Sequence, residues 1–250
     1  MNEQDLCKKR LLDLSRQADR KGIVLFSDFL NLNEMNIYHQ CQSEFVTRTE
    51  SYGGIPYAER QIIAFIPDAL YYEWTYPIAV LKVEPAYPKF AEELGHRDLL
   101  GSIMTLGIDR AKIGDILMGD GCYYIFCEEN VATYFMEQFT KVRHTLVHLS
   151  IADADEINFH QELIDKDGII TSNRLDAVIA CVYRLSRSQS QELIHAERVF
   201  ANGKIIQTPT YICKPDDIIS VRGHGRFHFI SISGETNKGR LKIKYQLYQS

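Results

Sequence analysis

Between residues 76 and 150, short apolar runs alternate with helix-like segments, and this order constrains the fold more than any other feature of the sequence. The segments are expected to be a strand (77–83), a helix (96–106), two strands (113–118 and 122–127), a helix (131–140) and a strand (145–149). Gly119-Asp120-Gly121 supplies the tight turn between the two central strands. The pattern predicts an α+β domain of the β-α-β-β-α-β type.

This is the order of ferredoxin-like folds and of RNA-recognition motifs, and we expect such a middle domain at residues 76–150. Tyr123, Tyr124 and Phe126 fall on a central strand, where RNA-recognition motifs place aromatic side chains that stack on bases. Core packing is the more common role of aromatic residues in a strand. Their sequence also does not match the usual pattern of that motif, so base stacking is the weaker interpretation.

The first 75 residues predict a small helical and strand region. Apolar residues recur at helical spacing between residues 4 and 20, and Gly22 follows where that helix would end. A second helix is expected after Ser27-Asp28, since either side chain could cap its first turn. Residues 51–57 indicate a loop, and the apolar run at 62–66 indicates a strand.

Charge is distributed unevenly along the chain. Residues 172–250 carry twelve Lys and Arg against six Asp and Glu, a net charge of +6, which leaves 16 basic and 27 acidic residues and a net charge of −11 for residues 1–171. A basic segment attached to an acidic body suggests that one end meets a polyanion. The acidic, turn-rich stretch 151–171 is interpreted as a linker between the two parts.

Beyond this linker, the sequence predicts a second α+β domain at residues 172–250. Two short helices are expected at 173–184 and 188–196, and Asn202-Gly203 is a strong signal for a two-residue hairpin. Residues 227–232 and 240–248 indicate a terminal hairpin in which Arg240, Lys242 and Lys244 share one face and apolar residues share the other.

Residues 172–227 contain a closely spaced set of short motifs. These are Arg174-Leu175-Asp176, Ser186-Arg187, Val199 to Lys204, and Val221 to Phe227, which reads V-R-G-H-G-R-F. The set closely resembles the S-four RNA-binding domain, which is named after a small-subunit ribosomal protein. The resemblance implies a compact domain that recognises the shape of folded RNA.

Basic and polar residues of this segment are our candidate RNA contacts. Ser186 lies three residues before Gln189, and Ser188 three before Gln191, so either pair could form a capping box at the start of the second helix. Such a helix end offers free amides to a phosphate beside the forked donors of Arg187. The complete candidate set is Arg174, Arg184, Ser186, Arg187, Ser188, Gln191, Asn202, Lys204, Arg222 and Arg226.

The resemblance extends over nearly the whole chain. Gly53-Gly54 with Ala58-Glu59-Arg60, and above all the stretch from His96 to Ile116, are similar to YlmH-like bacterial proteins. That family combines a short amino-terminal region, a middle domain like an RNA-recognition motif, and an S-four domain. The resemblance implies a cytoplasmic, monomeric factor of ribosome-associated quality control. Its implied partners are ribosomal RNA and peptidyl-tRNA on a large subunit, and other quality-control factors.

The chain departs from the family pattern at two turns. Relatives often carry Gly before the first hairpin strand, where this chain has Ala196-Glu197-Arg198. The family also tends to read V-x-x-G-D before its last conserved strand, whereas Pro215-Asp216-Asp217 lacks the Gly. These two turns are therefore where we expect the backbone to differ from the family pattern.

Other function classes have weaker signals. R-L-D also occurs in pseudouridine synthases, but only 74 residues follow Asp176, too few for a synthase domain. A protein scaffold linked to cell division remains a second alternative. His144 and His148 have no accompanying glutamate motif, and no P-loop or G-x-S-x-G is present, so we expect no metal, cofactor or catalytic residue.

Cellular context follows from two further absences in the sequence. No stretch approaches the roughly 20 apolar residues that span a bilayer, and the first residues lack an apolar signal segment. The six cysteines form no C-x-x-C pair, so they are expected to be reduced thiols. Both observations agree with the cytoplasmic, membrane-free expectation.

Overall fold

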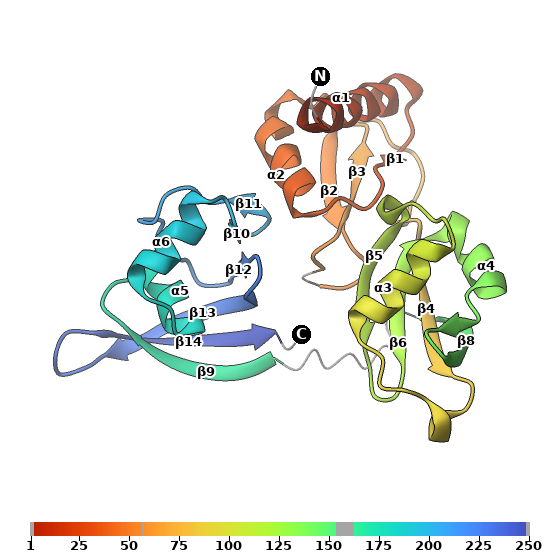
Figure 1. The fold of residues 1–250 in the computed structure, drawn as a ribbon. Helices are drawn as coiled ribbons and strands as arrows, with labels where there is room; N and C mark the ends of the chain where they lie inside the picture. The colour runs from red at the N-terminus through yellow and green to blue at the C-terminus, as the bar shows by residue number, and fades with distance from the viewer. Residues whose placement is uncertain (1–2, 57, 154–162, 249–250) are drawn as a thin grey trace. The chain divides into compact units, whose positions relative to one another are not determined.

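A computed structural model describes residues 3–56, 58–153 and 163–248 and divides the chain into two compact units, residues 1–159 and 160–250 (Figure 1). Tyr57 of the expected loop, residues 154–162 of the expected linker, and the last two residues lie outside the described part. Within that part, no helix is both long and apolar enough to cross a membrane.

Unit 1 begins with helices packed on a small sheet. Its elements are α1 (Glu3–Lys21), β1 (Leu25–Phe26), α2 (Leu32–Cys41), the 3-10 turn η1 (Gln42–Glu44), β2 (Arg48–Tyr52) and β3 (Ile62–Ile66). The strands form an antiparallel sheet in the order β1-β3-β2. Leu11 and Ala18 of α1 pack with Phe65 of β3, as expected from the helical spacing of the apolar residues.

Two expectations for this region are wrong in detail. The second helix starts at Leu32, because Asn31 caps it and forms a capping box with Glu34. Ser27 instead joins the sheet edge, where its hydroxyl oxygen accepts a hydrogen bond from the backbone N–H of Ile63 at 2.9 Å. The expected loop at 51–57 loses its first two residues to β2, since pairing with the buried strand β3 overrides their weak strand signal.

The middle part of unit 1 has the expected β-α-β-β-α-β order. It contains β4 (Ile78–Pro85), η2 (Pro88–Phe90), α3 (His96–Thr105), η3 (Arg110–Lys112), β5 (Ile113–Met118), β6 (Tyr123–Glu128), α4 (Glu129–Gln138), β7 (Lys141–Val142) and β8 (Thr145–Ala152). The short strand β7 was not expected. The sheet order is β5-β6-β4-β8-β7, and α3 and α4 bury one face through Leu99, Ile103 and Phe135.

The opposite face of this middle sheet is covered by the first part of the chain. Phe126 of β6 and Val80 of β4 form one cluster with Phe29 and Ile62, which come from the amino-terminal elements. Arg60 ties the same parts together by donating hydrogen bonds to three backbone carbonyls, those of Phe29, Arg110 and Ile113. The amino-terminal elements and the middle sheet therefore fold against each other within unit 1.

Unit 2 is a six-stranded antiparallel sheet with two helices on one face. Its elements are β9 (Leu163–Ile170), α5 (Leu175–Tyr183), α6 (Arg187–His195), β10 (Val199–Ala201), β11 (Lys204–Ile205), β12 (Asp217–Val221), β13 (Gly225–Glu235) and β14 (Leu241–Tyr248). The strand order is β11-β10-β12-β13-β14-β9. Leu175, Ile179 and Ile194 of the helices share a core with Phe227 and Ile243 of the sheet.

Strand β9 occupies residues that the sequence indicated as linker. It pairs with the full length of β14, from Leu241 opposite Ile170 to Tyr248 opposite Leu163. The sequence did not predict this strand, because its charged residues and its glycine have low intrinsic β-strand propensity. Gly168 is required for packing, since a Cβ atom there would lie 2.6 Å from the Sγ of Cys181 in α5. The domain bounds proposed from the sequence stay predictions.

Both departures from the family pattern fall on residues with left-handed backbone. Glu197, in the first of these two turns, adopts φ 55°, and Asp216, in the second, adopts φ 68°. A non-glycine residue pays a steric cost in this conformation. The turn at Glu197 forms without a glycine, and the Gln207 side chain donates a hydrogen bond to the Glu197 carboxylate at 2.7 Å.

Candidate nucleic-acid interface

A buried carboxylate organises the starts of both helices in unit 2. Asp176, in the first turn of α5, has no exposed surface, and it accepts hydrogen bonds from Arg174, Arg187 and Gln191. The shortest contact joins Nη2 of Arg187 to Oδ2 of Asp176 at 2.7 Å. These four residues are called the Asp176 cluster below. One carboxylate against two guanidinium groups leaves the cluster with a net positive charge.

Electrostatics keep this carboxylate charged. Burial by itself raises the pKa of Asp176, but hydrogen bonds from Gln191, Arg187 and Arg174 outweigh it and hold the pKa below the usual value. Asp176 therefore forms ion pairs with both Arg174 and Arg187. A fully enclosed carboxylate is a poor candidate for the catalytic aspartate of an RNA-modifying enzyme, because substrate cannot reach it.

The start of α6 lies beside this cluster. Ser186 caps the helix and forms the capping box with Gln189, so the first of the two expected boxes is the one that forms. The Ser188 hydroxyl lies 3.0 Å from the Ser186 hydroxyl and is exposed. Arg187, the first helical residue, is held by Asp176 and Thr171, yet 41% of its side chain is exposed. A fixed, half-exposed guanidinium beside a capped helix start is suited to binding a phosphate.

The candidate residues of the hairpin have different surroundings. Asn202 and Gly203 both take positive φ, as an N-G hairpin turn requires. The Asn202 side chain donates to Asp217 at 2.8 Å and accepts from the backbone N–H of Ile218 at 2.9 Å, so it holds the strands together. Lys204 is exposed, and no hydrogen bond or ion pair of its side chain occurs among the described residues.

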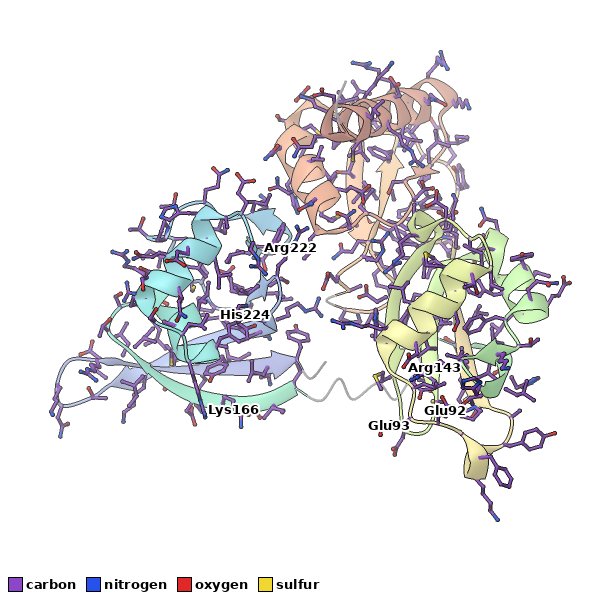
Figure 2. All side chains as sticks on the ribbon, viewed as in Figure 1. Glu92, Glu93, Arg143, Lys166, Arg222 and His224 are labelled. Atoms are coloured by element: carbon purple, nitrogen blue, oxygen red, sulfur yellow. The ribbon has the colours of Figure 1, made fainter. Side chains whose placement is uncertain are left out.

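The last three candidates lie at the ends of elements. Arg184 ends α5 in the left-handed conformation, with φ 54°, and is exposed. Arg222 follows β12 in the turn that also carries His224 (Figure 2). Its guanidinium lies 5.2 Å from the centroid of the Phe200 ring. Arg226 begins β13 and lies 4.1 Å from the centroid of the Tyr248 ring.

The ten candidates therefore do not form one group. The structure brings Arg174, Ser186, Arg187, Ser188 and Gln191 together at the helix starts. Strand alternation places Arg226 on the sheet face away from the helices, because its neighbour Phe227 belongs to the core under the helices. Arg222 lies apart from the helix starts too, in the turn after β12 and over the ring of Phe200.

Two hydrogen-bond partners of the candidate residues were not identified from the sequence. Thr171 accepts a hydrogen bond from Arg187 at 3.4 Å, and Arg198 donates to the backbone carbonyl of Arg222 at 2.9 Å. Arg198 could have been selected from the sequence, since it lies in the basic segment one residue before the Val199 to Lys204 motif. Thr171 had none, because it lay in the expected linker.

The aromatic residues of the middle domain are placed mainly in cores. Phe126 is fully buried against the amino-terminal elements, and Tyr123 donates its hydroxyl hydrogen to the backbone carbonyl of Leu94 at 3.1 Å. Tyr124 is partly buried against the same cluster as Phe126. In this structure the middle sheet thus lacks an open aromatic surface at Phe126 for a base to stack on.

No metal centre is visible in the described part of the chain. His148 lies in β8, the strand that was expected there, and His144 precedes it. Among residues 3–56, 58–153 and 163–248, no group of three or more His, Cys, Asp or Glu side chains could hold a metal ion. All six cysteines are free thiols.

Two protein families match the chain in sequence order. Residues 73–156 match the family described as "Putative RNA-binding domain in YlmH", and residues 174–219 match the S4 domain, called the S-four domain above. The second match contains the whole Asp176 cluster. The first covers the middle sheet, its helices and the residues just before them.

Individual proteins are similar to nearly the whole chain or to part of it. The "Ribosome-associated protein quality control protein P2" of Bacillus subtilis is 29% identical over 94% of this chain and 91% of its own length. The small ribosomal subunit protein uS4 of Magnetococcus marinus is 34% identical over 30% of this chain and 31% of its own. The solved "Cell division protein ylmH from Streptococcus pneumoniae" has a TM-score of 0.51 and 19% identity, over 63% of this chain and 95% of that one, which shows a shared fold.

Proposed function

Since the chain is a YlmH-like protein that ends in an S4 domain, we propose that it holds structured ribosomal RNA or tRNA through that domain and catalyses no reaction. The observation that carries the proposal is the Asp176 cluster at the start of α6. Arg174 and Arg187 are oriented by one buried carboxylate and remain 36% and 41% exposed. They can donate paired hydrogen bonds to phosphate without a large loss of side-chain freedom.

The type of RNA follows from this arrangement. Fixed cations and the amides of a helix start bind a sugar-phosphate backbone, and such contacts do not distinguish one base sequence from another. The major groove of A-form RNA is too narrow for side chains to read, so such a surface recognises shape. Ribosomal RNA and tRNA present this kind of folded backbone.

The finer assignment rests on a relative. The Bacillus subtilis protein is named for ribosome-associated protein quality control and aligns over nearly the whole chain. By analogy, we propose that this chain binds a large ribosomal subunit that still carries peptidyl-tRNA, as a monomer in the cytoplasm. In that role it would support template-free tailing of a stalled chain together with other quality-control factors.

Co-sedimentation with purified large subunits tests this function. The variant Arg187→Gln with Lys204→Gln removes two exposed cations of the S4 domain and leaves Asp176 with Arg174. Arg20→Gln with Lys21→Gln in α1 removes the same charge from unit 1 and serves as the control. We expect the S4 variant to bind more weakly, with the slope of log affinity against log salt smaller by about one per lost phosphate contact. Equal binding of both variants and the unmodified protein would contradict the proposed surface.

Mass mapping of RNA modifications tests the non-catalytic part of the proposal. Ribosomal RNA and tRNA from cells with and without the protein should carry the same set of modified nucleotides. A pseudouridine that disappears with the protein would favour the enzyme alternative.

A further inference from the structure

The small amino-terminal sheet has helices on one face and a loop on the other. Ile63 and Phe65 of β3 pack with residues of α1 and α2. Strand side chains alternate between faces, so Ala64 and Ile66 lie on the opposite face. There they form a cluster with residues of the segment between β3 and β4. That segment, residues 67–77, is called the aromatic loop below.

Aromatic rings extend across this second face. The ring centroids of Trp74 and Tyr76, both in the aromatic loop, lie 5.2 Å apart, and each lies 5.8 Å from that of Phe26 in β1. The ring of Tyr52 in β2 follows, 5.4 Å from that of Tyr76. Rings at these distances, tilted or edge-on to each other, stabilise one another beyond the area that they bury. The ring series therefore gives the aromatic loop a fixed base on the sheet.

The tip of the aromatic loop is exposed. Tyr71 is 94% exposed and Tyr72 is 47% exposed, while Tyr52 at the other end of the ring series is 39% exposed. The backbone N–H of Val24 donates a hydrogen bond to the Tyr72 hydroxyl at 2.7 Å, so the tip is held beside the start of β1. Single exposed aromatic residues are common, but a group of them marks a binding surface. Since Tyr and Trp contribute much of the binding energy in protein interfaces, the tip has the composition of such an interface.

Carboxylates accompany these rings. The aromatic loop contains Asp68 and Glu73 and no Lys, Arg or His. Both carboxylates are exposed, and neither forms an ion pair within residues 3–56, 58–153 and 163–248. Glu50 of β2 lies opposite Ala64 and therefore on the same face of the sheet. Its carboxylate has a weak contact with Arg48, at 3.7 Å, and both of these side chains are at least half exposed.

The balance of charge selects the class of partner. Arg48 and Lys21, which ends α1 three residues before Val24, are cations close to the rings, and the three carboxylates outnumber them. A guanidinium can stack on an aromatic face and donate paired hydrogen bonds to a carboxylate. Rings and carboxylates together therefore favour arginine over lysine. RNA is disfavoured, because its phosphates would meet the same carboxylates without a surplus of cations to offset them.

We propose that the aromatic loop, together with Glu50 and Tyr52 of β2, binds an extended protein segment rich in arginine. The arginine side chains of that segment stack on the exposed rings and pair with Asp68 and Glu73. The surface belongs to unit 1, so this partner is additional to the RNA of the proposed function. The inference gives the acidic part of the chain a binding role of its own.

A peptide titration of the full chain tests the inference. The probe is a short synthetic peptide that alternates Arg with Ala, and its companion carries Gln in place of every Arg. Trp74 is the single tryptophan of the chain, so its fluorescence reports on this surface. The test variant is Tyr71→Ala with Glu73→Gln. The matched control is Tyr87→Ala with Glu93→Gln, which removes the same groups from exposed positions outside the loop.

We expect the Arg peptide to change the Trp74 emission to saturation in the unmodified protein and in the control. The test variant should bind this peptide about tenfold more weakly, with an unchanged midpoint of urea unfolding, because Tyr71 and Glu73 are exposed. Three results would each overturn the inference: no response to the Arg peptide, equal affinity of the test variant and the control, or an equal response to the Gln peptide. A short RNA hairpin that displaces the Arg peptide would assign the surface to nucleic acid instead. The titration contains no ribosome, so its failure leaves the proposed function standing.

Discussion

The two large sheets of this protein each carry helices on one face, but their other faces differ. In the middle sheet, Phe126 and Val80 are buried by Phe29 and Ile62 from the start of the chain. In the sheet of unit 2, the corresponding face carries Lys242 and Lys244 of β14, both exposed, while their neighbours Ile243 and Tyr245 are buried under the helices. Helices on one face of a sheet therefore do not decide whether the other face is open to a ligand. The side chains at alternate strand positions decide it, together with what the rest of the chain packs against them.

The largest expected effect comes from opening the covered face. Phe126→Ala should destabilise unit 1 by about 3–5 kcal/mol, because it leaves a cavity at a fully buried aromatic position. Urea unfolding followed by Trp74 fluorescence measures this loss. Trp74 is the single tryptophan of the chain, and its ring centroid lies 5.2 Å from that of Tyr76. Tyr76 packs against the cluster that contains Phe126. A loss below about 1 kcal/mol would mean that the amino-terminal elements do not close this face.

The helix side of unit 2 depends on charge instead. Asp176→Asn should destabilise α5 and α6 by about 2 kcal/mol at neutral pH, since hydrogen bonds to a charged group are weakened and two arginines lose their counter-ion. Hydrogen exchange of the amides in residues 175–195 measures the change. Asp165→Asn is the matched control, because Asp165 is exposed and lies on strand β9.

The stability difference between the unmodified protein and the Asp176→Asn variant should depend on pH in a defined direction. The folded pKa of Asp176 lies below its unfolded value of about 3.9. The carboxylate therefore contributes its full stabilisation above the unfolded pKa and loses it as pH falls through the folded pKa. The difference in stability between the unmodified protein and the Asp176→Asn variant should shrink below about pH 4. A difference that stays constant down to about pH 2 would contradict the charged cluster.

Local signals in the sequence were sufficient where they agreed with tertiary packing. The order of the middle domain and the Asn202-Gly203 hairpin were both predictable, because each depends on short-range spacing or turn chemistry. The S4 domain and the YlmH-like organisation were recognisable from motifs.

The features that could not be predicted depend on contacts between residues far apart in the sequence. Strand β9 exists because the distant strand β14 pairs with it along its whole length, and its own sequence reads as linker. The division of the candidate residues between two faces also needed the register of β12 and β13, which places Arg226 beside Ser220. Asn202 was named for its place in a motif, and only the structure shows that its side chain serves the hairpin.

A smaller effect distinguishes the two capping boxes that the sequence allowed. Ser186→Ala should lower the stability of α6 by about 1 kcal/mol, because it removes the hydroxyl that accepts from the backbone N–H of Gln189. Ser188→Ala is the matched control and should change stability by less than about 0.5 kcal/mol. Hydrogen exchange of the first amides of α6 measures both. The reverse ranking would show that the cap lies at Ser188.

The smallest effect belongs to the open face of unit 2. Lys242→Gln and Lys244→Gln should each change stability by less than about 0.5 kcal/mol, in contrast to Phe126→Ala on the covered face. Lys244→Gln should cost slightly more than Lys242→Gln at low salt, because Lys244 alone of the two has a carboxylate opposite it, that of Asp167. Salt screens exposed pairs of this kind, so the two variants should become equally stable near about 1 M salt. Chemical denaturation with urea at both salt concentrations measures the difference. A large loss from either substitution would mean that the lysines serve the fold and that the two faces differ less than their exposure indicates.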